Sequence, residues 1–362
     1  MSAAQSPARY TNCGFRYHPT PMAAHTLTRL PDLAAAGLTS ALDADRLASV
    51  AARYAVAVTP AMAALVDSAD ASDPIGLQFL PQLAELETSA DETGDPTGDL
   101  THSPVAGIVH RYPDRVLLTP THVCAVYCRF CFRRERVGPG RGGALSAVAL
   151  ERALAYVASR PEIWEVILTG GDPLVLSARR LRALMRRLGQ IEHVKVVRIH
   201  TRIPAVAPER ITAPLVAAMK AAGKATYVSL HANHPRELTP AARAACARII
   251  DAGVPMLSQS VLLRGVNDDA EILATLMRGF VETRIRPYYL HHGDAAPGTA
   301  HLRVPLDEGR ALVKALRGRL SGLAQPTFVV DIPGGFGKVP VGPGYLADGM
   351  IEDPWGAVHR LG

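Results

Sequence analysis

Short apolar runs rich in β-branched residues alternate with amphipathic segments through most of the chain. Six such runs lie at residues 115–121, 165–171, 194–201, 225–232, 255–263 and 285–292. Runs of this length and composition predict buried strands, and the apolar spacing between them predicts helices. A strand followed by a helix, repeated six times, predicts a parallel sheet with right-handed crossovers.

The number of repeats limits the choice of fold within the α/β class. A closed barrel needs eight units, so six units predict a partial (β/α)6 barrel, with a doubly wound sheet as the alternative. Each predicted strand ends in polar or glycine-rich sequence. Barrels of this type gather their active sites at the C-terminal ends of the strands. A seventh apolar run, at residues 326–342, is expected to close part of this mouth as a C-terminal capping segment.

The two ends of the chain differ from this regular core. Residues 38–56 have helical spacing, whereas residues 87–105 are rich in acids and turn formers and are expected to form a linker or a long surface arm. We therefore expect an N-terminal helical region and arm at residues 1–108. The barrel is expected at residues 109–305 and a C-terminal segment at residues 306–362.

Composition and charge exclude several classes of protein. The 362 residues are 48% hydrophobic, which is enough to bury a large core. Much of the net charge of +6 comes from arginines at residues 177–189 that flank an apolar stripe, so they predict a solvated helix face and no nucleic-acid partner. No apolar run reaches the roughly 18 residues of a membrane span, and the first residues lack the apolar stretch of a secretory signal. A cytoplasmic protein without a membrane partner is expected.

Three of the five cysteines, Cys124, Cys128 and Cys131, lie within eight consecutive residues of the stretch THVCAVYCRFCFRR at residues 121–134. Structural zinc sites usually take four ligands, commonly as two pairs, and no second pair is present. A four-iron cluster held by three thiolates keeps one iron free for another ligand. The pattern therefore favours a [4Fe-4S] cluster over a structural metal knuckle. Cys246 is expected to pack inside a helix, and no role is assigned to Cys13.

This cysteine pattern, with Phe130 before the last thiol, resembles the CxxxCxφC signature of the radical S-adenosylmethionine superfamily. The stretch LTGGDPL at residues 168–174 resembles the glycine-rich motif with which that superfamily holds its cosubstrate. The resemblance implies that the free iron chelates S-adenosyl-L-methionine. It also implies that Gly170, Gly171 and Asp172 contribute to binding it.

Further stretches resemble one subfamily, the lysine 2,3-aminomutases, from about residue 70 to about residue 345. They are residues 110–118, 198–212, 229–238, 259–268, 286–303 and 326–341, in the same order and at similar spacing. Lys338 stands in a glycine turn from which an amine can reach into a cavity and bond to an aldehyde. The resemblance implies that Lys338 binds pyridoxal 5'-phosphate, with Arg111 and Arg115 near the cofactor phosphate.

The same resemblance implies the substrate and the reaction. Arg133 matches the family residue that meets the substrate carboxylate, and Asp294 and Asp331 match the two acids that hold the ε-ammonium group of lysine. Two carboxylates that converge on a cation favour lysine over an acidic substrate. The implied reaction is an isomerisation in which a 5′-deoxyadenosyl radical starts a shift of the amino group from C2 to C3, giving β-lysine.

Other interpretations remain open at this point. A related aminomutase could act on arginine or glutamate, or on a lysine of a translation factor, and a non-enzyme alternative is an iron-sulfur electron carrier or sensor. The expected partners are a small-molecule amino acid and a reductant such as flavodoxin or ferredoxin. A homo-oligomer is expected, but without the structural zinc of known relatives, because no cysteine follows Cys246. His291 and His292 end a predicted strand, where ligand contact and a structural role are equally compatible with the sequence.

Overall fold

The computed structural model describes residues 25–138, 140, 142–347 and 349–360. Cys13 lies outside the described residues, as does the first part of the expected N-terminal region. Nine strands form one continuous sheet in the order of the chain. They are β1 (Ile108–Tyr112), β2 (Arg115–Thr121), β3 (Glu165–Gly170), β4 (Val196–Thr201), β5 (Ala225–His231), β6 (Met256–Val261), β7 (Ile285–His291), β8 (Thr327–Ile332) and β9 (Gly337–Pro340).

Strands β2 to β8 are parallel, and β1 and β9 add one antiparallel strand at each edge. The sequential strand order confirms the predicted partial barrel, with one parallel strand more than the six predicted, and shows that the doubly wound alternative is wrong. The described strands leave the barrel open between β1 and β9. The last apolar run supplies both β8 and β9, so the sheet extends into the C-terminal segment.

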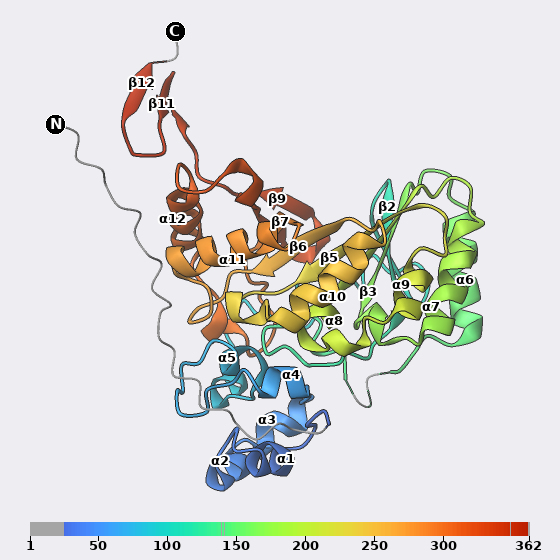
Figure 1. Ribbon diagram of the computed structural model, residues 1–362, viewed down its shortest axis with the longest axis horizontal. Helices are drawn as coiled ribbons and strands as arrows, with labels where there is room; N and C mark the ends of the chain where they lie inside the picture. The colour runs from blue at the N-terminus through green and yellow to red at the C-terminus, as the bar shows by residue number, and fades with distance from the viewer. Residues whose placement is uncertain (1–24, 139, 141, 348, 361–362) are drawn as a thin grey trace, which may run out of the picture.

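Helices connect the parallel strands and lie along the outside of the curved sheet (Figure 1). They are α6 (Ala147–Ala158), α7 (Ala178–Gly189), α8 (Ile203–Val206), α9 (Ala213–Met219), α10 (Pro240–Asp251), α11 (Ala270–Glu282) and α12 (Leu306–Leu316). The serine side chains of Ser146 and Ser177 cap α6 and α7, since each accepts a hydrogen bond from the first helical turn. Helix α7 buries its apolar stripe on the sheet and leaves its arginines outside, as the residue pattern predicts. Cys246 is buried in α10, also as predicted.

The N-terminal residues form a small helical lobe at one end of the molecule (Figure 1). Its helices are α1 (Leu30–Ala35), α2 (Ala41–Arg46), α3 (Ala48–Arg53), α4 (Pro60–Ala63) and α5 (Gly76–Phe79). Short 3-10 helices also occur in the described residues, at η1 (Leu83–Leu86), η2 (Pro173–Val175), η3 (Pro208–Arg210), η4 (Pro235–Glu237), η5 (Ala300–Leu302), η6 (Gly322–Ala324) and η7 (Pro333–Gly335).

The expectation of a linker or a surface arm at residues 87–105 is wrong for its central part. Residues 96–99 are buried against the glycine turn that precedes Lys338. The backbone N–H of Gly334 donates to the carbonyl of Pro96 at 3.3 Å. A Cβ atom on residue 98 would lie 2.7 Å from the carbonyl carbon of Gly334, so only glycine allows this close packing. The segment is therefore part of the wall of the barrel mouth.

The C-terminal residues fold into a separate sheet of three short strands, β10 (Leu346–Ala347), β11 (Met350–Glu352) and β12 (Val358–Arg360). This sheet projects away from the barrel (Figure 1). The capping of the mouth therefore falls to β8, β9 and the turn between them. In the described part of the chain, no helix combines the length and the apolar character needed to cross a membrane.

Candidate active site

A cavity of about 570 Å³ opens at the mouth of the barrel and receives side chains from every strand from β1 to β9. It is large enough for more than one small ligand. All candidate residues except Cys124 line it, namely Arg111, Arg115, Cys128, Cys131, Arg133, Gly170, Gly171, Asp172, Asp294, Asp331 and Lys338. The fold thus brings together side chains that are more than 200 positions apart in the sequence.

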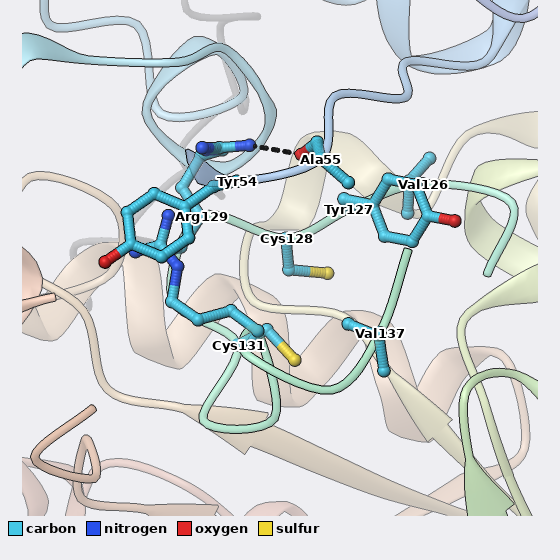
Figure 2. A pocket seen from close by; sticks show the side chains of 9 residues that line it. Tyr54, Ala55, Val126, Tyr127, Cys128, Arg129, Cys131 and Val137 are labelled. Atoms are coloured by element: carbon cyan, nitrogen blue, oxygen red, sulfur yellow. Dashed lines mark hydrogen bonds between the residues drawn. The ribbon is translucent and has the colours of Figure 1, made fainter. Parts of the chain in front are cut away.

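The three cysteines lie on the loop that follows β2. Arg129, within this loop, is almost fully buried, and its guanidinium binds both carboxylate oxygens of Glu85 at 2.9 and 2.5 Å. It also donates to the carbonyl of Ala55 at 2.8 Å, as Figure 2 shows beside a small cavity of about 20 Å³ behind Cys128 and Cys131. The N-terminal lobe therefore holds the cysteine loop in place.

The three thiols lie in a mostly buried environment, close enough for their charges to affect one another. Burial, with the nearby charges of Asp172 and the other two cysteines, raises the pKa of the Cys124 thiol well above its usual range. Burial and the proximity of Cys128 raise the pKa of Cys131 to about 11. Such a group can hold three negative charges only when a cationic centre is bound. The guanidinium of Arg202 contributes one positive charge, because it donates to Cys128 Sγ at 3.0 Å.

The glycines at the end of β3 fit tightly against the cysteine loop. A Cβ atom on residue 171 would lie 2.3 Å from the carbonyl oxygen of Val123, and the N–H of Gly171 donates to the carbonyl of Thr121 at 2.7 Å. Gly170 has a φ of 102°, and a Cβ there would lie 2.0 Å from Cγ2 of Thr119. Both glycines are therefore needed by the protein's own packing, in addition to leaving their backbone open to the cavity.

Asp172 is buried and points into the protein rather than toward a ligand. Its carboxylate accepts hydrogen bonds from the hydroxyl of Thr201 at 2.7 and 2.8 Å, from the N–H of Arg202 at 2.7 Å and from the N–H of Leu174 at 2.9 Å. Burial raises its pKa, although these hydrogen bonds act in the opposite direction. Asp172 thus joins the ends of β3 and β4 beside the cysteine loop.

The hairpin of β1 and β2 supplies Arg111 and Arg115 to the lining of the cavity. The guanidinium of Arg115 stacks on the ring of Tyr112 at 3.7 Å and also donates to Asp114 at 2.7 Å. The hydroxyl of Tyr112 accepts a hydrogen bond from the backbone N–H of Lys338 at 2.7 Å. This contact fixes the glycine turn against the hairpin.

Asp99 is a central residue of the site that the sequence pattern did not reveal. Asp99 is 1% exposed. Its carboxylate accepts hydrogen bonds from Arg111 at 3.1 Å and Arg133 at 2.7 Å, and it forms an ion pair with Arg136 at 3.7 Å. Burial acts to raise the pKa of Asp99, but the arginines outweigh it and hold the pKa below its ordinary value. Asp99 therefore holds Arg111 and Arg133 in place through one carboxylate.

Lys338 lies in a cluster with two acids and a histidine at the ends of β7 to β9. Its ammonium group forms an ion pair with Asp331 and lies 3.1 Å from His291 Nδ1. Burial would raise the pKa of Asp331, but the contacts with His291 and Lys338 lower it far below its usual value. Burial and the charge of Asp331 raise the pKa of Asp294 to about 7. The two carboxyl groups thus have different preferred charge states in the same cavity.

Two further histidines, His200 and His231, line the cavity at the ends of β4 and β5. His200 Nδ1 lies 3.3 Å from the amide nitrogen of Gln259. Burial, with the charge of Arg198 for His200 and of Arg202 for His231, lowers both pKa values well below the usual range. No sequence pattern marked either residue as a site residue, although both lie at polar strand ends that predict a position at the mouth.

The polar atoms of the site show whether it suits an iron-sulfur cluster and organic cofactors. In the described residues, no group of three or more His, Cys, Asp or Glu side chains is arranged to hold a single metal ion. A cubane differs from a single ion, because each thiolate binds a separate iron and the ligands stand further apart. Three buried polar atoms at the cavity have no hydrogen-bond partner among the described residues, namely Arg111 Nε, His200 Nε2 and His231 Nε2. Such groups are matched by a polar ligand, so the residues fit both kinds of cofactor.

Comparison with known proteins identifies two family models along the chain. The model described as the radical SAM superfamily matches residues 118–277, and the model described as lysine-2,3-aminomutase matches residues 313–350. The first match contains the cysteine loop and the glycines after β3. The second contains Asp331 and Lys338.

Individual proteins match most of the chain. The L-lysine 2,3-aminomutase of Clostridium subterminale is 42% identical over 291 residues, which cover 80% of this chain and 70% of that protein. The enzyme of the same name from Acetoanaerobium sticklandii is 41% identical over 291 residues, again 80% and 70% of the two chains. The glutamate 2,3-aminomutase of Clostridioides difficile is 36% identical over 297 residues, which cover 82% and 70%. The chain therefore belongs to the lysine 2,3-aminomutase family of radical S-adenosylmethionine enzymes.

Proposed function

We propose that this protein is an isomerase that moves the amino group of L-lysine from C2 to C3 and so produces β-lysine. One observation carries the proposal: the three-thiol loop and the cluster of Lys338 with two aspartates open into the same cavity of about 570 Å³. A radical source and an amine-binding group must share one closed space in such a reaction. The names of the relatives at 42% and 41% identity support the same substrate.

Membership of this family implies a [4Fe-4S] cluster, S-adenosyl-L-methionine and pyridoxal 5'-phosphate. Cys124, Cys128 and Cys131 would hold the cluster, and the open backbone of Gly170 and Gly171 would contact the sulfonium cosubstrate. When bound, these groups supply the radical and the conjugated π system that the amino shift requires. Asp172 would act here by fixing the ends of β3 and β4, since its oxygens are already used by Thr201 and Arg202.

Lys338 would hold pyridoxal phosphate, and Arg111 and Arg115 would face its anionic groups. The arginines are well suited to this role because planar guanidinium groups bind phosphate through paired hydrogen bonds. Arg111 has a buried Nε without a partner, which is available to a ligand. The hydrogen bond from the Lys338 backbone to Tyr112 fixes the backbone of Lys338 beside the hairpin that carries both arginines.

The charges of the cavity select the substrate in this proposal. Arg133 would bind the carboxylate of lysine, since Asp99 holds its Nε and no hydrogen bond among the described residues engages its other two nitrogens. Asp294 and Asp331 would bind the distal ammonium group. An ammonium beside Asp294 would lower its raised pKa and favour the carboxylate, so binding of lysine is coupled to loss of a proton. Glutamate would bring a second carboxylate against these two acids, which costs several kcal/mol in a closed site.

The walls of the cavity would protect the reaction from water. Apolar or aromatic side chains of Val116, Leu117, Ile167, Phe130 and Phe132 line it between the polar groups. A radical on carbon removes hydrogen from any donor in reach, so exclusion of stray donors is part of the catalytic task.

The experiment is anaerobic reconstitution with iron, sulfide, pyridoxal phosphate, S-adenosylmethionine and dithionite, followed by chromatography of incubations with lysine, arginine, glutamate and alanine. Conversion of lysine to β-lysine is expected. If lysine returns unchanged while glutamate is isomerised, the substrate is wrong and the reaction type is right. The variant Asp331→Asn is expected to raise the KM for lysine at unchanged iron content. If lysine binding and iron content fall to the same extent, this acid has a structural role.

The proposal extends to partners and location. The protein would act in the cytoplasm with a flavodoxin or ferredoxin as the electron donor, and as a homo-oligomer without a zinc link between subunits. Two large apolar side chains support an oligomer, because Phe336 is 82% exposed beside the cavity and Trp355 is 80% exposed on the C-terminal sheet. Light scattering of the intact protein tests this point, and a monomer at micromolar concentration would contradict it.

A further inference from the structure

The side-chain nitrogen of Lys338 makes two polar contacts. Its ammonium group forms an ion pair with Asp331 and donates to His291 Nδ1 at 3.1 Å. His291 Nδ1 in turn lies 3.6 Å from Asp331 Oδ2. The side chains are 20%, 12% and 19% exposed for Lys338, Asp331 and His291, so solvent has limited access to all three.

These contacts conflict with the two proposed roles of the residues, namely cofactor binding by Lys338 and substrate binding by Asp331. An ammonium group has no lone pair, so Lys338 cannot bond to an aldehyde until it loses a proton. Asp331 cannot bind the ammonium group of a substrate while it is paired with Lys338. One proton on Lys338 therefore blocks the cofactor site and half of the substrate site.

We propose that His291 is the proton acceptor of Lys338, and that this transfer opens the site for the aldehyde cofactor and then for the substrate. The inference rests on the function proposed above. An N–H bond of the Lys338 ammonium breaks, an N–H bond forms at His291 Nδ1, and the positive charge moves from one side chain to the other. The neutral amine keeps its lone pair for the cofactor, and His291 later releases the proton to water.

Geometry favours His291 over the other groups near Lys338. Asp331 is in contact, but its pKa is held far below the usual range, so it is a poor acceptor. Tyr289 faces Lys338 with its ring at 5.7 Å, and burial raises the pKa of its hydroxyl, which makes it neutral. Asp294 acts on Lys338 through its charge, and no hydrogen bond joins the two among the described contacts.

The electrostatics of His291 suit a temporary acceptor. Burial and the charge of Lys338 lower the pKa of His291, so the imidazole is neutral while Lys338 is charged. Once the proton has moved, the repulsion from Lys338 is gone and Asp331 stabilises the imidazolium at 3.6 Å. The groups that face His291 are Lys338 from β9, Asp331 from β8, Tyr289 from β7, His200 from β4 and His231 from β5. The two other histidines have lowered pKa values and add no positive charge at neutral pH.

The next residue provides a matched control. His292 has the same side chain, but its Nε2 lies 2.8 Å from the carbonyl of Val304 and it does not line the cavity. A change at His292 perturbs the same strand end without touching Lys338.

The test measures how fast the full-length, cluster-reconstituted protein attaches pyridoxal phosphate at Lys338 in the absence of amino acid. Samples are trapped with borohydride, and the modified Lys338 peptide is quantified by mass spectrometry from pH 6 to pH 10. His291→Asn keeps an acceptor atom near the Nδ1 position but cannot take a proton. Attachment is expected to slow on the order of 100-fold at pH 7.5. The deficit should shrink as the pH rises, because hydroxide then replaces His291 as the proton acceptor. His292→Asn should match the unaltered protein throughout.

The outcomes separate this inference from the proposed function. If His291→Asn attaches the cofactor as fast as the unaltered protein at pH 7.5, or is slower by one constant factor at every pH, His291 is not the acceptor. If the unaltered protein forms no adduct at Lys338 at any pH, the proposed role of Lys338 fails and the inference fails with it. His291→Ala with added imidazole gives an independent check. Imidazole should restore the rate at pH 7.5, and absence of rescue in a folded variant would overturn the proposal.

Discussion

Replacement of Asp99 by asparagine tests how far the substrate site depends on a residue that we do not place in contact with the substrate. The carboxylate of Asp99 accepts from Arg111 at 3.1 Å and from Arg133 at 2.7 Å, and it lies 3.7 Å from Arg136. Asparagine has nearly the same shape but no charge, so Asp99→Asn leaves three arginines around a neutral amide.

The magnitude follows from the burial of the partners. Removal of one partner from a buried ion pair costs about 3–5 kcal/mol. The amide of asparagine keeps one acceptor oxygen, and the side chains of Arg111, Arg133 and Arg136 are 11%, 14% and 25% exposed. Water therefore compensates part of the loss, and we expect the free energy of unfolding to fall by about 2 kcal/mol. Looser placement of Arg133 should raise the KM for lysine on the order of tenfold, which corresponds to about 1.4 kcal/mol.

Urea unfolding and steady-state kinetics of the reconstituted enzyme measure the two effects, and iron analysis shows whether the cluster is retained. Asp91→Asn is the matched control from the same segment, because Asp91 pairs with Arg303 at the surface and its side chain is 60% exposed. The control should change stability by less than about 0.5 kcal/mol. Unchanged stability and unchanged KM in Asp99→Asn would refute the assignment of Asp99 as the anchor of the arginines.

Three further predictions concern the pH response and the cysteine loop. Because the pKa of Asp294 is raised to about 7, its contribution to stability is complete below about pH 4 and is lost as the pH rises through 7. Asp294→Asn should therefore have a higher urea midpoint than the lysine-free parent protein at pH 8 and the same midpoint at about pH 4, and a constant difference would contradict this. Cys124→Ser should lose the iron and the electron paramagnetic resonance signal of the cluster, whereas Cys246→Ser, altered inside α10, should retain both. Gly171→Ala should displace the cysteine loop and lose iron, while Gly143→Ala, which has open space around it, should not.

The fold was predictable because its strands carry a local signal. Most positions of the parallel strands are buried or half-buried, so each strand appears in the sequence as a short, largely apolar run with turn formers after it. The run at residues 255–263 became β6 at Met256–Val261, and the other runs agree as closely. The strand count was less certain, since the run at residues 326–342 splits at its glycines into β8 and β9.

The site was predictable only where a motif or a strand end marks it. Asp99 has no such mark, because it stands in a turn-forming stretch and its partners are 12 and 34 positions away. The direction of Asp172 is equally hidden. The sequence predicts that Asp172 lies at the mouth. Only the packing of β3 against β4 shows that its carboxylate accepts hydrogen bonds from Thr201 and Arg202. Ligand roles at these positions stay predictions until the variants are measured.

The close packing of Gly98 on Gly334 has a consequence for biosynthesis. Residues 96–99 leave the ribosome long before residues 331–338, so the wall that they build together cannot exist until residues 331–338 have also been made. Joining segments so distant in the chain is a late and slow event in folding. A nascent or C-terminally truncated chain would therefore leave the cofactor chamber open on this side, which makes such chains targets for cellular quality control.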